Sequence, residues 1–388
     1  MLRLLLAAPI LALVFASPAF AAAKAPAGNK FYQAPTSLIA GKPGTVIWSR
    51  AVKKAPVHLK QSAATTLILY RSRSVSGKAI AVSGTVDVPK GKAPKGGWKV
   101  ISWAHGTTGM ADICAPSRNT TSGPAFGYVD YTTPMLNSWL KKGYAVLRTD
   151  YEGLGTPGPH PYLIGNSEGR SVVDIALAAR RLNASLSKHF MIAGHSQGGQ
   201  ASLFAAQGAK TWAPSLQLKG VLAFAPASHF YAQKSLLPLL TSPSGLSPLA
   251  AMIVASASRA SSVDPSSLMS PAASALLPDL ESKCSAQLAA TDSFGGIAPA
   301  DLLTPGADQG QLDAALNGMN PAVKLSVPAA IWQGSSDSTV FASFTAQLVE
   351  EITPAPQYVT WTGLDHSAVV TDAASQKAAT VWISSKLG

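Results

Sequence analysis

The sequence has few charged residues, few cysteines and no long apolar run beyond its N-terminus. Asp, Glu, Lys and Arg make up 13% of the 388 residues, against a typical share of roughly 25%. This low charge, together with 32 Gly and 28 Pro spread along the chain, excludes a coiled coil, a collagen-like rod and a charge-rich disordered protein. A membrane-spanning helix needs about 20 consecutive apolar residues. Because no such run follows the N-terminus, the sequence also excludes a polytopic membrane protein.

Two cysteines are too few for a metal cluster, and neither Cys114 nor Cys284 belongs to a C-x-x-C motif. In an oxidising compartment, a single structural disulfide is the simplest interpretation of such a pair. Two separate buried thiols are the alternative.

The N-terminus has the pattern of a signal peptide. Arg3 supplies the positive region, Leu4 to Phe15 form an apolar stretch, and Ala19-Phe20-Ala21 is an A-x-A cleavage site. The apolar stretch is too short to cross a bilayer. We therefore expect cleavage after residues 1–21 and a secreted or periplasmic mature protein. A retained anchor is the alternative.

The formal net charge is +12 at pH 7, which suits contact with anionic surfaces. The basic residues are scattered and accompany no zinc-finger or RNP motif, so we expect no nucleic-acid partner. Gly153 to Gly158 match G-x-G-x-x-G, but Pro157, Pro159 and Pro161 prevent the helix that a dinucleotide site requires. No Walker A or H-E-x-x-H motif is present, and we expect neither a metal nor a cofactor.

Short apolar runs alternate with helical patterns along the chain. Strands are predicted at Thr65–Tyr70, Ile80–Val88, Trp98–Ala104, Tyr144–Asp150, Phe190–Gly194, Gly220–Phe224, Ala329–Trp332 and Tyr358–Trp361. Helices are predicted at Thr133–Lys142, Arg170–Leu182, Gly198–Gly208, Phe341–Glu351 and Thr371–Leu387. The later strands are continuously apolar, as in a parallel sheet that is buried on both faces. The pattern therefore predicts an α/β fold with a mostly parallel central sheet and flanking helices.

One interval interrupts this alternation. The residues between Pro226 and Pro328 are rich in Ala, Ser, Leu and Pro and contain no convincing strand. A connection between a strand and the next helix normally needs only a few residues, so we expect an inserted helical subdomain here. The predicted organisation is a core of residues 22–225 and 327–388 with a helical cap of residues 226–326.

The strongest motif is Gly194-His195-Ser196-Gln197-Gly198, a G-x-S-x-G pattern between an apolar strand and a helix-forming stretch. This context is typical of a nucleophile elbow, in which the serine stands at a sharp strand-to-helix turn. Gly194 and Gly198 lack the Cβ atoms that would clash in such a turn. The motif predicts Ser196 as an exposed, activated nucleophile near the positive end of a helix.

A serine hydroxyl needs a base, and the base needs an orienting acid. In this type of fold the chain order is Ser, then Asp or Glu, then His. His366 and Asp337 each follow a predicted strand, so both would lie at the carboxyl edge of the sheet, where ligands of open α/β folds bind. We therefore predict Asp337 and His366 as acid and base. Asp365 and His229 are weaker alternatives.

An oxyanion hole requires two N–H donors near this serine. One should be the backbone N–H of Gln197, the residue after the nucleophile. The other should come from the loop His105-Gly106-Thr107-Thr108-Gly109, which follows an early strand. Thr107 is the preferred donor and Gly109 the alternative, while His105 is interpreted as a structural residue of the turn.

These segments together resemble the secretory lipases, lipase-A type, of the α/β-hydrolase superfamily. The segments that carry the resemblance are Trp103–Gly109 with Cys114–Ser117, Asp150–Gly155, Pro161–Gly165, Gly194–Gly199, and the loops of Asp337 and His366. The resemblance implies an α/β-hydrolase fold, a Ser196–Asp337–His366 triad and a cap in the insertion. It also implies a disulfide that ties the loop at Cys114 to the cap at Cys284.

The hypothesis is hydrolysis of carboxylic esters with apolar acyl chains, by a lipase or esterase that forms an acyl-enzyme on Ser196. The apolar runs Leu236–Leu240, Leu249–Val254 and Ala275–Leu277 would line an acyl pocket, or they form only the core of the cap itself. The expected partner is a small-molecule or lipid ester, with transient contact to a lipid interface. A serine peptidase or acyltransferase with the same triad and a non-catalytic binding protein with the same fold are the alternatives.

Overall fold

The computed structural model describes residues 24–388. The predicted signal peptide, residues 1–21, lies outside the described residues. Within them, nine strands form one sheet: β1 (Val46–Val52), β2 (Ser62–Arg73), β3 (Ala79–Pro89), β4 (Trp98–Ala104), β5 (Ala145–Thr149), β6 (Leu186–His195), β7 (Gln217–Phe224), β8 (Ala329–Gly334) and β9 (Gln357–Trp361). Their order across the sheet is β1-β2-β3-β5-β4-β6-β7-β8-β9.

The part of the sheet from β5 to β9 is parallel throughout, whereas β1, β2 and β3 pair antiparallel and β3 joins β5 antiparallel. All the predicted strands are present, and the expectation of a mostly parallel sheet with flanking helices is confirmed. Strand β1 is an addition to the prediction. It is an edge strand with one neighbour and a register shift near Trp48, so its sequence carries neither clean alternation nor a continuous apolar run.

The helices within the described residues are α1 (Thr36–Ile39), α2 (Phe126–Asp130), α3 (Thr133–Lys141), α4 (Gly165–Leu182), α5 (Gln197–Trp212), α6 (Phe230–Lys234), α7 (Leu246–Ala260), α8 (Pro271–Ala275), α9 (Ser285–Leu288), α10 (Gly310–Gly318), α11 (Ala342–Glu351), α12 (Ala368–Thr371) and α13 (Ala373–Leu387). Short 3₁₀ turns occupy Gly28–Tyr32, Asp112–Cys114, Pro116–Arg118, Leu237–Leu239, Pro265–Ser267, Leu277–Glu281, Phe294–Gly296 and Pro299–Asp301. The predicted helix Thr371–Leu387 is wrong at its start. The chain breaks at Asp372, whose carboxylate caps α13 by accepting the N–H of Ser375.

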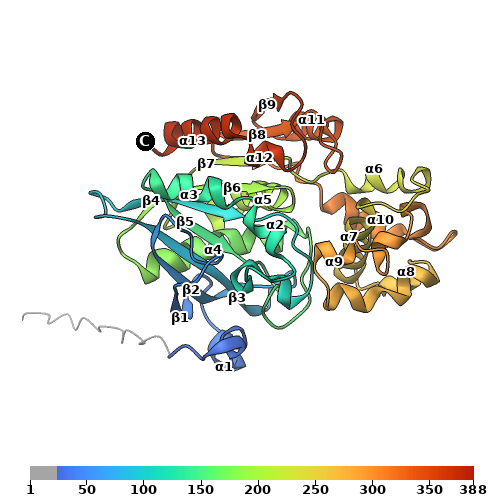
Figure 1. Ribbon diagram of the computed structural model, residues 1–388, viewed down its shortest axis with the longest axis horizontal. Coiled ribbons are helices and arrows are strands. Elements are labelled where there is room, and N and C mark those ends of the chain that lie inside the picture. Colours follow the sequence, from blue (N-terminus) through green and yellow to red (C-terminus); the bar gives the residue numbers. More distant parts are fainter. Residues whose placement is uncertain (1–23) are drawn as a thin grey trace, which may run out of the picture.

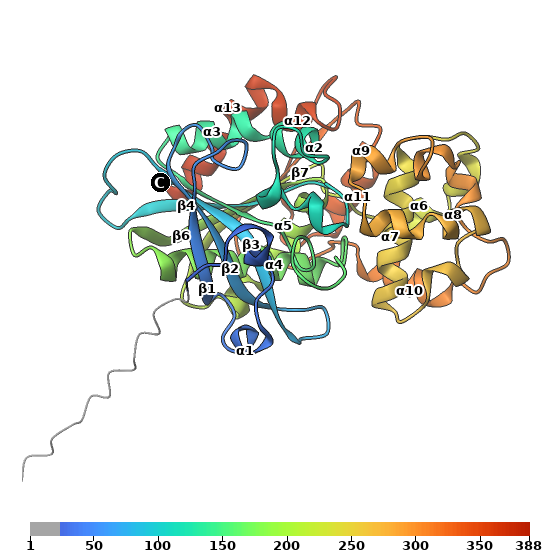
Figure 2. The ribbon, with the colours of Figure 1, turned by 60° about the horizontal axis from the view of Figure 1, so that its bottom comes forward.

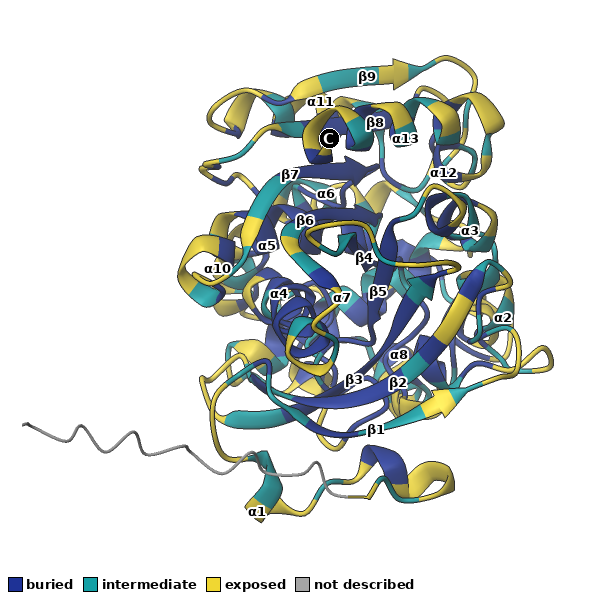
Figure 3. Ribbon diagram, turned by 90° about the vertical axis from the view of Figure 1, so that its left-hand side faces the viewer, coloured by how far each residue is buried: buried dark blue, intermediate teal, exposed yellow. Residues whose placement is uncertain are grey.

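Helices cover both faces of the sheet. Helices α4 and α5 pack against each other and against the central strands on one face, while α3, α12 and α13 contribute to the core on the other face. The central strands are buried and the edge strands β1 and β9 are partly exposed (Figure 3). This burial on two faces explains why the central strands have continuously apolar sequences.

The chain between β7 and β8 contains helices and turns and no strand among the described residues. These helices, α6 to α10, gather beyond one end of the sheet (yellow to orange in Figures 1 and 2). Buried apolar side chains of these helices and of the turns between them, including Met252, Leu288 and Phe294, join the core that also covers one face of the sheet.

Cys114 and Cys284 form a disulfide with a Cα–Cα distance of 5.5 Å. The two cysteines are therefore paired and are not two separate buried thiols. The bond links the loop after β4 to the helical segment, across 170 positions of sequence. Beside it, Gly109 and Cys284 form an isolated antiparallel bridge. The loop after β4 is therefore attached to the helical segment by both side chains and backbone.

No helix among residues 24–388 has the length and apolar character needed to span a membrane.

Candidate active site

Ser196 stands at the turn between β6 and α5. Its backbone angles are φ 60° and ψ −118°, a conformation that costs an ordinary residue about 1–3 kcal/mol. A Cβ atom on Gly194 would lie 2.1 Å from the carbonyl oxygen of Gly198, and one on Gly198 would lie 2.0 Å from the carbonyl oxygen of Ala104. The two glycines of the motif are thus required by backbone contacts, as the elbow interpretation expects.

The predicted acid and base lie in loops at the carboxyl ends of β8 and β9. Nδ1 of His366 lies 2.7 Å from Oδ2 of Asp337. The other carboxylate oxygen, Oδ1, accepts the backbone N–H groups of Thr339 and Val340, both at 2.8 Å. Ser196 and His366 line the same cavity, so the structure places the three predicted triad residues around one site.

The electrostatics of Asp337 favour the charged form. Burial raises the pKa of this carboxyl group, but the hydrogen bond and charge of His366 and the N–H groups of Val340 and Thr339 outweigh burial. The net result is a pKa below the ordinary value. An ionised Asp337 accepts a hydrogen bond from the Nδ1–H of His366. In the neutral imidazole this tautomer has its lone pair on Nε2, which can then act as a base.

Asp365 and His229, the weaker alternatives for acid and base, have hydrogen-bond partners outside the proposed triad. Oδ1 of Asp365 accepts the N–H groups of Ser367 and Ala368 at the start of α12. Nε2 of His229 lies 3.2 Å from Glu351, and its ring stacks on Phe344.

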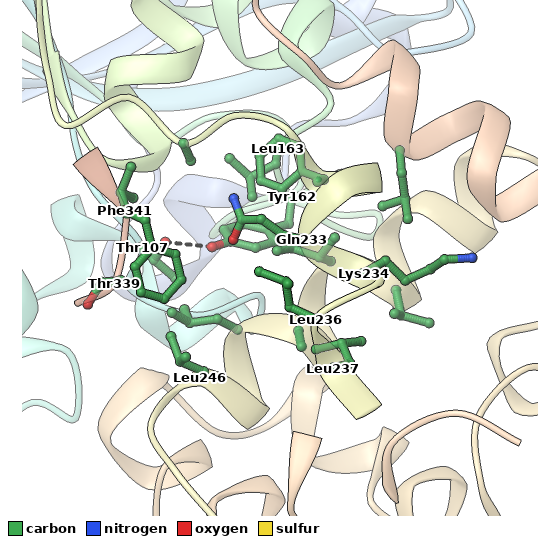
Figure 4. A pocket seen from close by; sticks show the side chains of 18 of the residues that line it. Thr107, Tyr162, Leu163, Gln233, Lys234, Leu236, Leu237, Leu246, Thr339 and Phe341 are labelled. Atoms are coloured by element: carbon green, nitrogen blue, oxygen red, sulfur yellow. Dashed lines mark hydrogen bonds between the residues drawn. The ribbon is translucent and has the colours of Figure 1, made fainter. Parts of the chain in front are cut away.

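The two predicted oxyanion donors flank the serine. Gln197 is the first residue of α5, a position whose N–H has no partner within the helix. Thr107 lines both cavities that contain Ser196, and its hydroxyl group bonds to the hydroxyl of Tyr162 at 2.7 Å (Figure 4). Gly109 instead pairs with Cys284 beside the disulfide. This difference favours Thr107 over Gly109 as the second donor.

His105 remains within its own turn. Its Nδ1 lies 2.7 Å from the carbonyl oxygen of Gly106, and its ring lies 4.4 Å from that of Tyr151. Burial lowers the pKa of His105 to about 4, so its ring is neutral at pH 7.

Behind Gln197 lies a buried polar group that the sequence did not reveal. The side-chain nitrogen Nε2 of Gln197 donates to Oε1 of Glu168 at 2.7 Å and lies 3.1 Å from Nε2 of His160. Burial raises the pKa of Glu168 to about 8 and lowers that of His160 to about 4. Although Nε2 of His160 is 3.6 Å from Oε1 of Glu168, both groups are mainly uncharged at neutral pH and form no ion pair.

Two cavities meet at Ser196. The first has a mostly apolar lining. Its lining residues are Thr107, Tyr162, Leu163, Ser196, Ala227, Phe230, Gln233, Lys234, Leu236, Leu237, Leu240, Leu246, Leu249, Ala250, Ile253, Val254, Leu316, Thr339, Val340 and Phe341. Figure 4 shows Thr107 and Phe341 towards one end of this cavity and Leu237 and Lys234 towards the other.

His366 lines the second cavity. Several of its lining residues carry hydroxyl groups, and none is Lys, Arg, Asp or Glu; the hydroxyl-bearing residues are Thr107, Tyr128, Tyr131, Ser196, Ser244, Ser285, Ser338, Thr339 and Ser367. In the described part of the chain, no cluster of three or more His, Cys, Asp or Glu has an arrangement that could hold a metal ion.

The arrangement of sheet and helices is the α/β-hydrolase fold, as predicted. The crystal structure of Candida antarctica lipase A superimposes with a TM-score of 0.72 and 20% identity, covering 87% of this chain and 80% of that protein. The rice cell wall degrading esterase LipA from Xanthomonas oryzae superimposes with a TM-score of 0.72 and 17% identity, covering 90% of this chain and all of that chain (100%).

Residues 126–235 match the model of the secretory lipase family, which confirms the resemblance to secretory lipases. A Mycobacterium tuberculosis protein named a probable inactive lipase is 30% identical over 207 residues, which cover 52% of this chain and 46% of the relative. Lipase A of Moesziomyces aphidis is 28% identical over 200 residues, which cover 50% of this chain and 42% of the relative. In both comparisons the matched region spans less than half of the relative's own length.

The buried Glu168 predicts a specific dependence of stability on pH. Between the ordinary carboxyl pKa of 4.5 and the raised value of about 8, the unfolded chain loses this proton while the folded protein keeps it. Unfolding then releases a proton, so rising pH favours the unfolded state across this interval. Glu168→Gln keeps an uncharged hydrogen-bond acceptor and removes the part of the pH dependence of stability that comes from the Glu168 proton. We expect the variant to gain stability relative to wild type as pH rises from 5 to 8.

Denaturant unfolding at several pH values measures this difference. Glu350→Gln, on the exposed surface of α11, is the control and should follow the wild-type profile. A constant difference between Glu168→Gln and wild type over the whole range would contradict a protonated Glu168.

Proposed function

We propose that this protein is a serine carboxylic-ester hydrolase, a lipase or esterase, that acts on esters with apolar acyl chains. The observation that carries the proposal is the hydrogen bond between Asp337 and His366, together with the position of His366 in the same cavity as Ser196, which also lines the adjoining apolar cavity. The likeness to lipases and esterases supports the same class of reaction.

In the proposed reaction, Nε2 of His366 accepts the hydroxyl proton of Ser196 while Oγ attacks the ester carbonyl carbon. A positioned base of this kind accelerates such a step about 10²- to 10⁴-fold. The oxyanion that forms is stabilised by the N–H groups of Thr107 and Gln197, each worth roughly 3 kcal/mol. Collapse of the tetrahedral intermediate expels the alcohol, which takes the proton from His366. Water activated by the same imidazole then hydrolyses the acyl-enzyme on Ser196.

The two cavities divide the substrate into its two parts. The leaving oxygen must come within hydrogen-bond reach of His366, so the alcohol part belongs in the cavity that His366 lines. The acyl chain then occupies the other, mostly apolar cavity, where burial contributes about 0.8 kcal/mol for each CH₂ group. A lining rich in hydroxyl groups and free of Lys, Arg, Asp and Glu suits an uncharged alcohol.

Residues 226–326 form the proposed cap of a core made of residues 22–225 and 327–388. The support is that α6, α7 and the turn between them supply much of the lining of the apolar cavity, including Leu246, Leu249 and Ile253. Closure of such a cap over the serine would exclude water and strengthen the interactions of the oxyanion. The runs Leu236–Leu240 and Leu249–Val254 would therefore serve a substrate as well as the cap's own packing. No residue of Ala275–Leu277 lines either cavity, and Leu276 and Leu277 pack against the hydrophobic core instead.

The proposed localisation is secreted or periplasmic, supported by the N-terminal pattern of residues 1–21 and by the match to a secretory family. Contact with a lipid interface is proposed at the turn after α6. Leu239 is 74% exposed, and Leu236 near it in sequence and Tyr231 of α6 are also exposed. Leu236, Leu237 and Leu240 of the same segment line the apolar cavity, so a lipid surface bound here would lie next to the acyl site.

A peptidase or an acyltransferase would use the same three residues, and a relative with a name that denotes an inactive lipase makes a non-catalytic role a relevant alternative. The apolar character of the acyl cavity favours an ester of a fatty acid over a peptide. The intact Ser196, Asp337 and His366 favour catalysis over binding alone.

Fluorophosphonate labelling tests the catalytic serine. Wild-type protein should be labelled at Ser196 and should hydrolyse p-nitrophenyl esters. Ser196→Ala should not be labelled, and Asp337→Asn should lose about 10³- to 10⁴-fold in kcat because His366 would hold the wrong tautomer. Lys210→Ala, on the exposed face of the same helix, is the control and should keep both activities. Absence of labelling in folded wild-type protein would support the binding-protein alternative, and activity confined to peptides would support a peptidase.

A substitution in the apolar cavity should shorten the preferred acyl chain. Leu237 lies towards the end of the cavity away from Thr107 (Figure 4). Leu237→Trp should reduce kcat/KM for long-chain p-nitrophenyl esters by about tenfold or more, the cost of two lost methylenes. Rates on acetate and butyrate esters should be unchanged. Val381→Trp, on the exposed surface of α13, is the matched control. An equal loss on short and long chains would place the acyl group elsewhere.

Leu239→Asp should weaken binding to lipid while leaving the chemistry intact. Because Leu239 is exposed and does not line either cavity, kcat/KM on a soluble short-chain ester should stay at the wild-type value. Partitioning to anionic vesicles and activity on emulsified triglyceride should fall roughly tenfold, as expected for the loss of one inserted leucine. Val381→Asp provides the control. Unchanged vesicle binding by Leu239→Asp would refute this surface as the lipid contact.

A further inference from the structure

The histidine directly before the nucleophile has no part in the proposed reaction, yet it is bound on both sides. His195 is the last residue of β6, and its side chain is only 2% exposed. Its Nε2 lies 2.8 Å from the backbone carbonyl oxygen of His366, and its Nδ1 lies 2.6 Å from the hydroxyl of Tyr131. The rings of His195 and His366 are 4.5 Å apart.

The two partners of His195 determine its tautomer. A carbonyl oxygen only accepts hydrogen bonds, so Nε2 of His195 must carry the proton that it donates to His366. Nδ1 then holds the lone pair, and the hydroxyl of Tyr131 must be the donor to it. Burial raises the pKa of the Tyr131 phenol, which keeps this hydroxyl protonated.

The bond from His195 to His366 spans a part of the sheet that no strand pairing joins directly. Ser196 follows β6, while His366 follows the edge strand β9, and β7 and β8 lie between them. His195 is covalently next to Ser196, so its bond to the backbone of His366 couples the main chain of the nucleophile to that of the base. Proton transfer requires these two side chains within about 2.6–3.2 Å of each other. The hydrogen bond from His195 to the backbone of His366 therefore acts directly on the distance between the side chains of Ser196 and His366.

The charge of His195 also bears on this role. Burial and the neighbouring His366 lower the pKa of His195 well below its ordinary value, against smaller opposite effects of the bond to His366 and of Asp337. Tyr131, His366 and Asp337 are the titratable groups that face it. His195 thus stays neutral, and its ring adds no positive charge beside the imidazolium that forms on His366 during catalysis.

We infer that His195 and Tyr131 are positioning residues for the base: Tyr131 fixes the tautomer of His195, and His195 holds the backbone of His366 in reach of Ser196. This inference rests on the proposed function, because it assigns His366 as the base of a serine hydrolase. Neither residue takes or gives a proton in the reaction.

Replacement of His195 separates positioning from binding. His195→Leu should lower kcat about 10- to 100-fold, the range expected when a catalytic group is misplaced by about 1 Å. KM should change much less than kcat, although His195 also lines the cavity proposed for the alcohol. The rate of fluorophosphonate labelling, which needs His366 but no ester alcohol, should fall in parallel. His195→Gln should restore most of the rate, because its amide Nε2 can occupy the position of the imidazole Nε2 and donate to the same carbonyl. His189→Leu, on the same strand far from Ser196, should behave as wild type.

A double-mutant cycle tests the role of Tyr131 in the tautomer. In the wild-type background, Tyr131→Phe should lower kcat about fivefold, the effect of one ordinary hydrogen bond. In the His195→Gln background, the same substitution should change kcat by less than about twofold, because an amide has no tautomer to select. A purely structural or substrate-binding role of Tyr131 would give the same loss in both backgrounds and would overturn this part of the inference.

The outcomes distinguish this inference from the proposed function. If wild-type protein is labelled at Ser196 and active, and His195→Leu matches it within about twofold in kcat and labelling rate, the positioning role is wrong and the triad stands. If folded wild-type protein is neither labelled nor active, the proposed function fails first. Should His195→Leu not fold, as thermal unfolding would show, the cycle of Tyr131→Phe with His195→Gln still decides the question.

Discussion

The reversal of the chain from β6 into α5 at Ser196 constrains every residue around this serine. The turn brings α5 so close to neighbouring backbone that a Cβ atom on Gly198 would lie 2.0 Å from Ala104 O, and one on Gly199 would lie 2.8 Å from Phe224 O. This close approach points the start of α5, with its free N–H groups and positive dipole end, at the site. The strain at Ser196 is held by packing on both sides, and the same packing fixes the N–H of Gln197 next to the hydroxyl.

The proposed acid and base depend on a second set of constraints, because they come from loops after the outer strands β8 and β9. Asp337 is fixed by its own loop through Thr339 and Val340 and by the buried Gln333 of β8, whose Nε2 donates to Oδ2 at 3.0 Å. The orientation of Gln333 is in turn set by Thr345 of α11, which donates to its Oε1 at 2.8 Å. The imidazole of His366 is thus held from the acid side by a chain of bonds that reaches into the helical layer. On the serine side, the bond from His195 gives the corresponding support.

The sequence allowed prediction of the strands, the main helices and the residues around Ser196 because each has a local pattern. Continuous apolar runs mark buried parallel strands, and Gly194 and Gly198 mark a turn that only glycine permits. Asp337 and His366 could be predicted as site residues because each follows a strand. The roles of His195, Tyr131, Glu168 and His160 could not be predicted, because a buried polar residue leaves no local periodic signal and its partners are distant in sequence. The P-Y-L-I-G segment at Tyr162 belonged to the resemblance, yet its hydrogen bond to Thr107 required the folded chain.

His195, Tyr131, Glu168 and His160 are all uncharged at neutral pH. A polar interior can therefore surround the site without placing a fixed charge next to the charge that develops in the proposed reaction. At neutral pH, Glu168 keeps its proton while His160 and His195 lack theirs, and Lys234, at the apolar cavity, is paired with Asp313. Asp337 is the buried carboxylate whose pKa is lowered by contact with His366. A fixed positive charge on the ring of His195, 4.5 Å from that of His366, would oppose the imidazolium by about 4 kcal/mol at an effective dielectric constant of about 20. Neutral hydrogen bonds can hold the proposed catalytic groups as firmly without this penalty, so the charge of Asp337 is the one that the imidazolium of the proposed reaction would meet at close range.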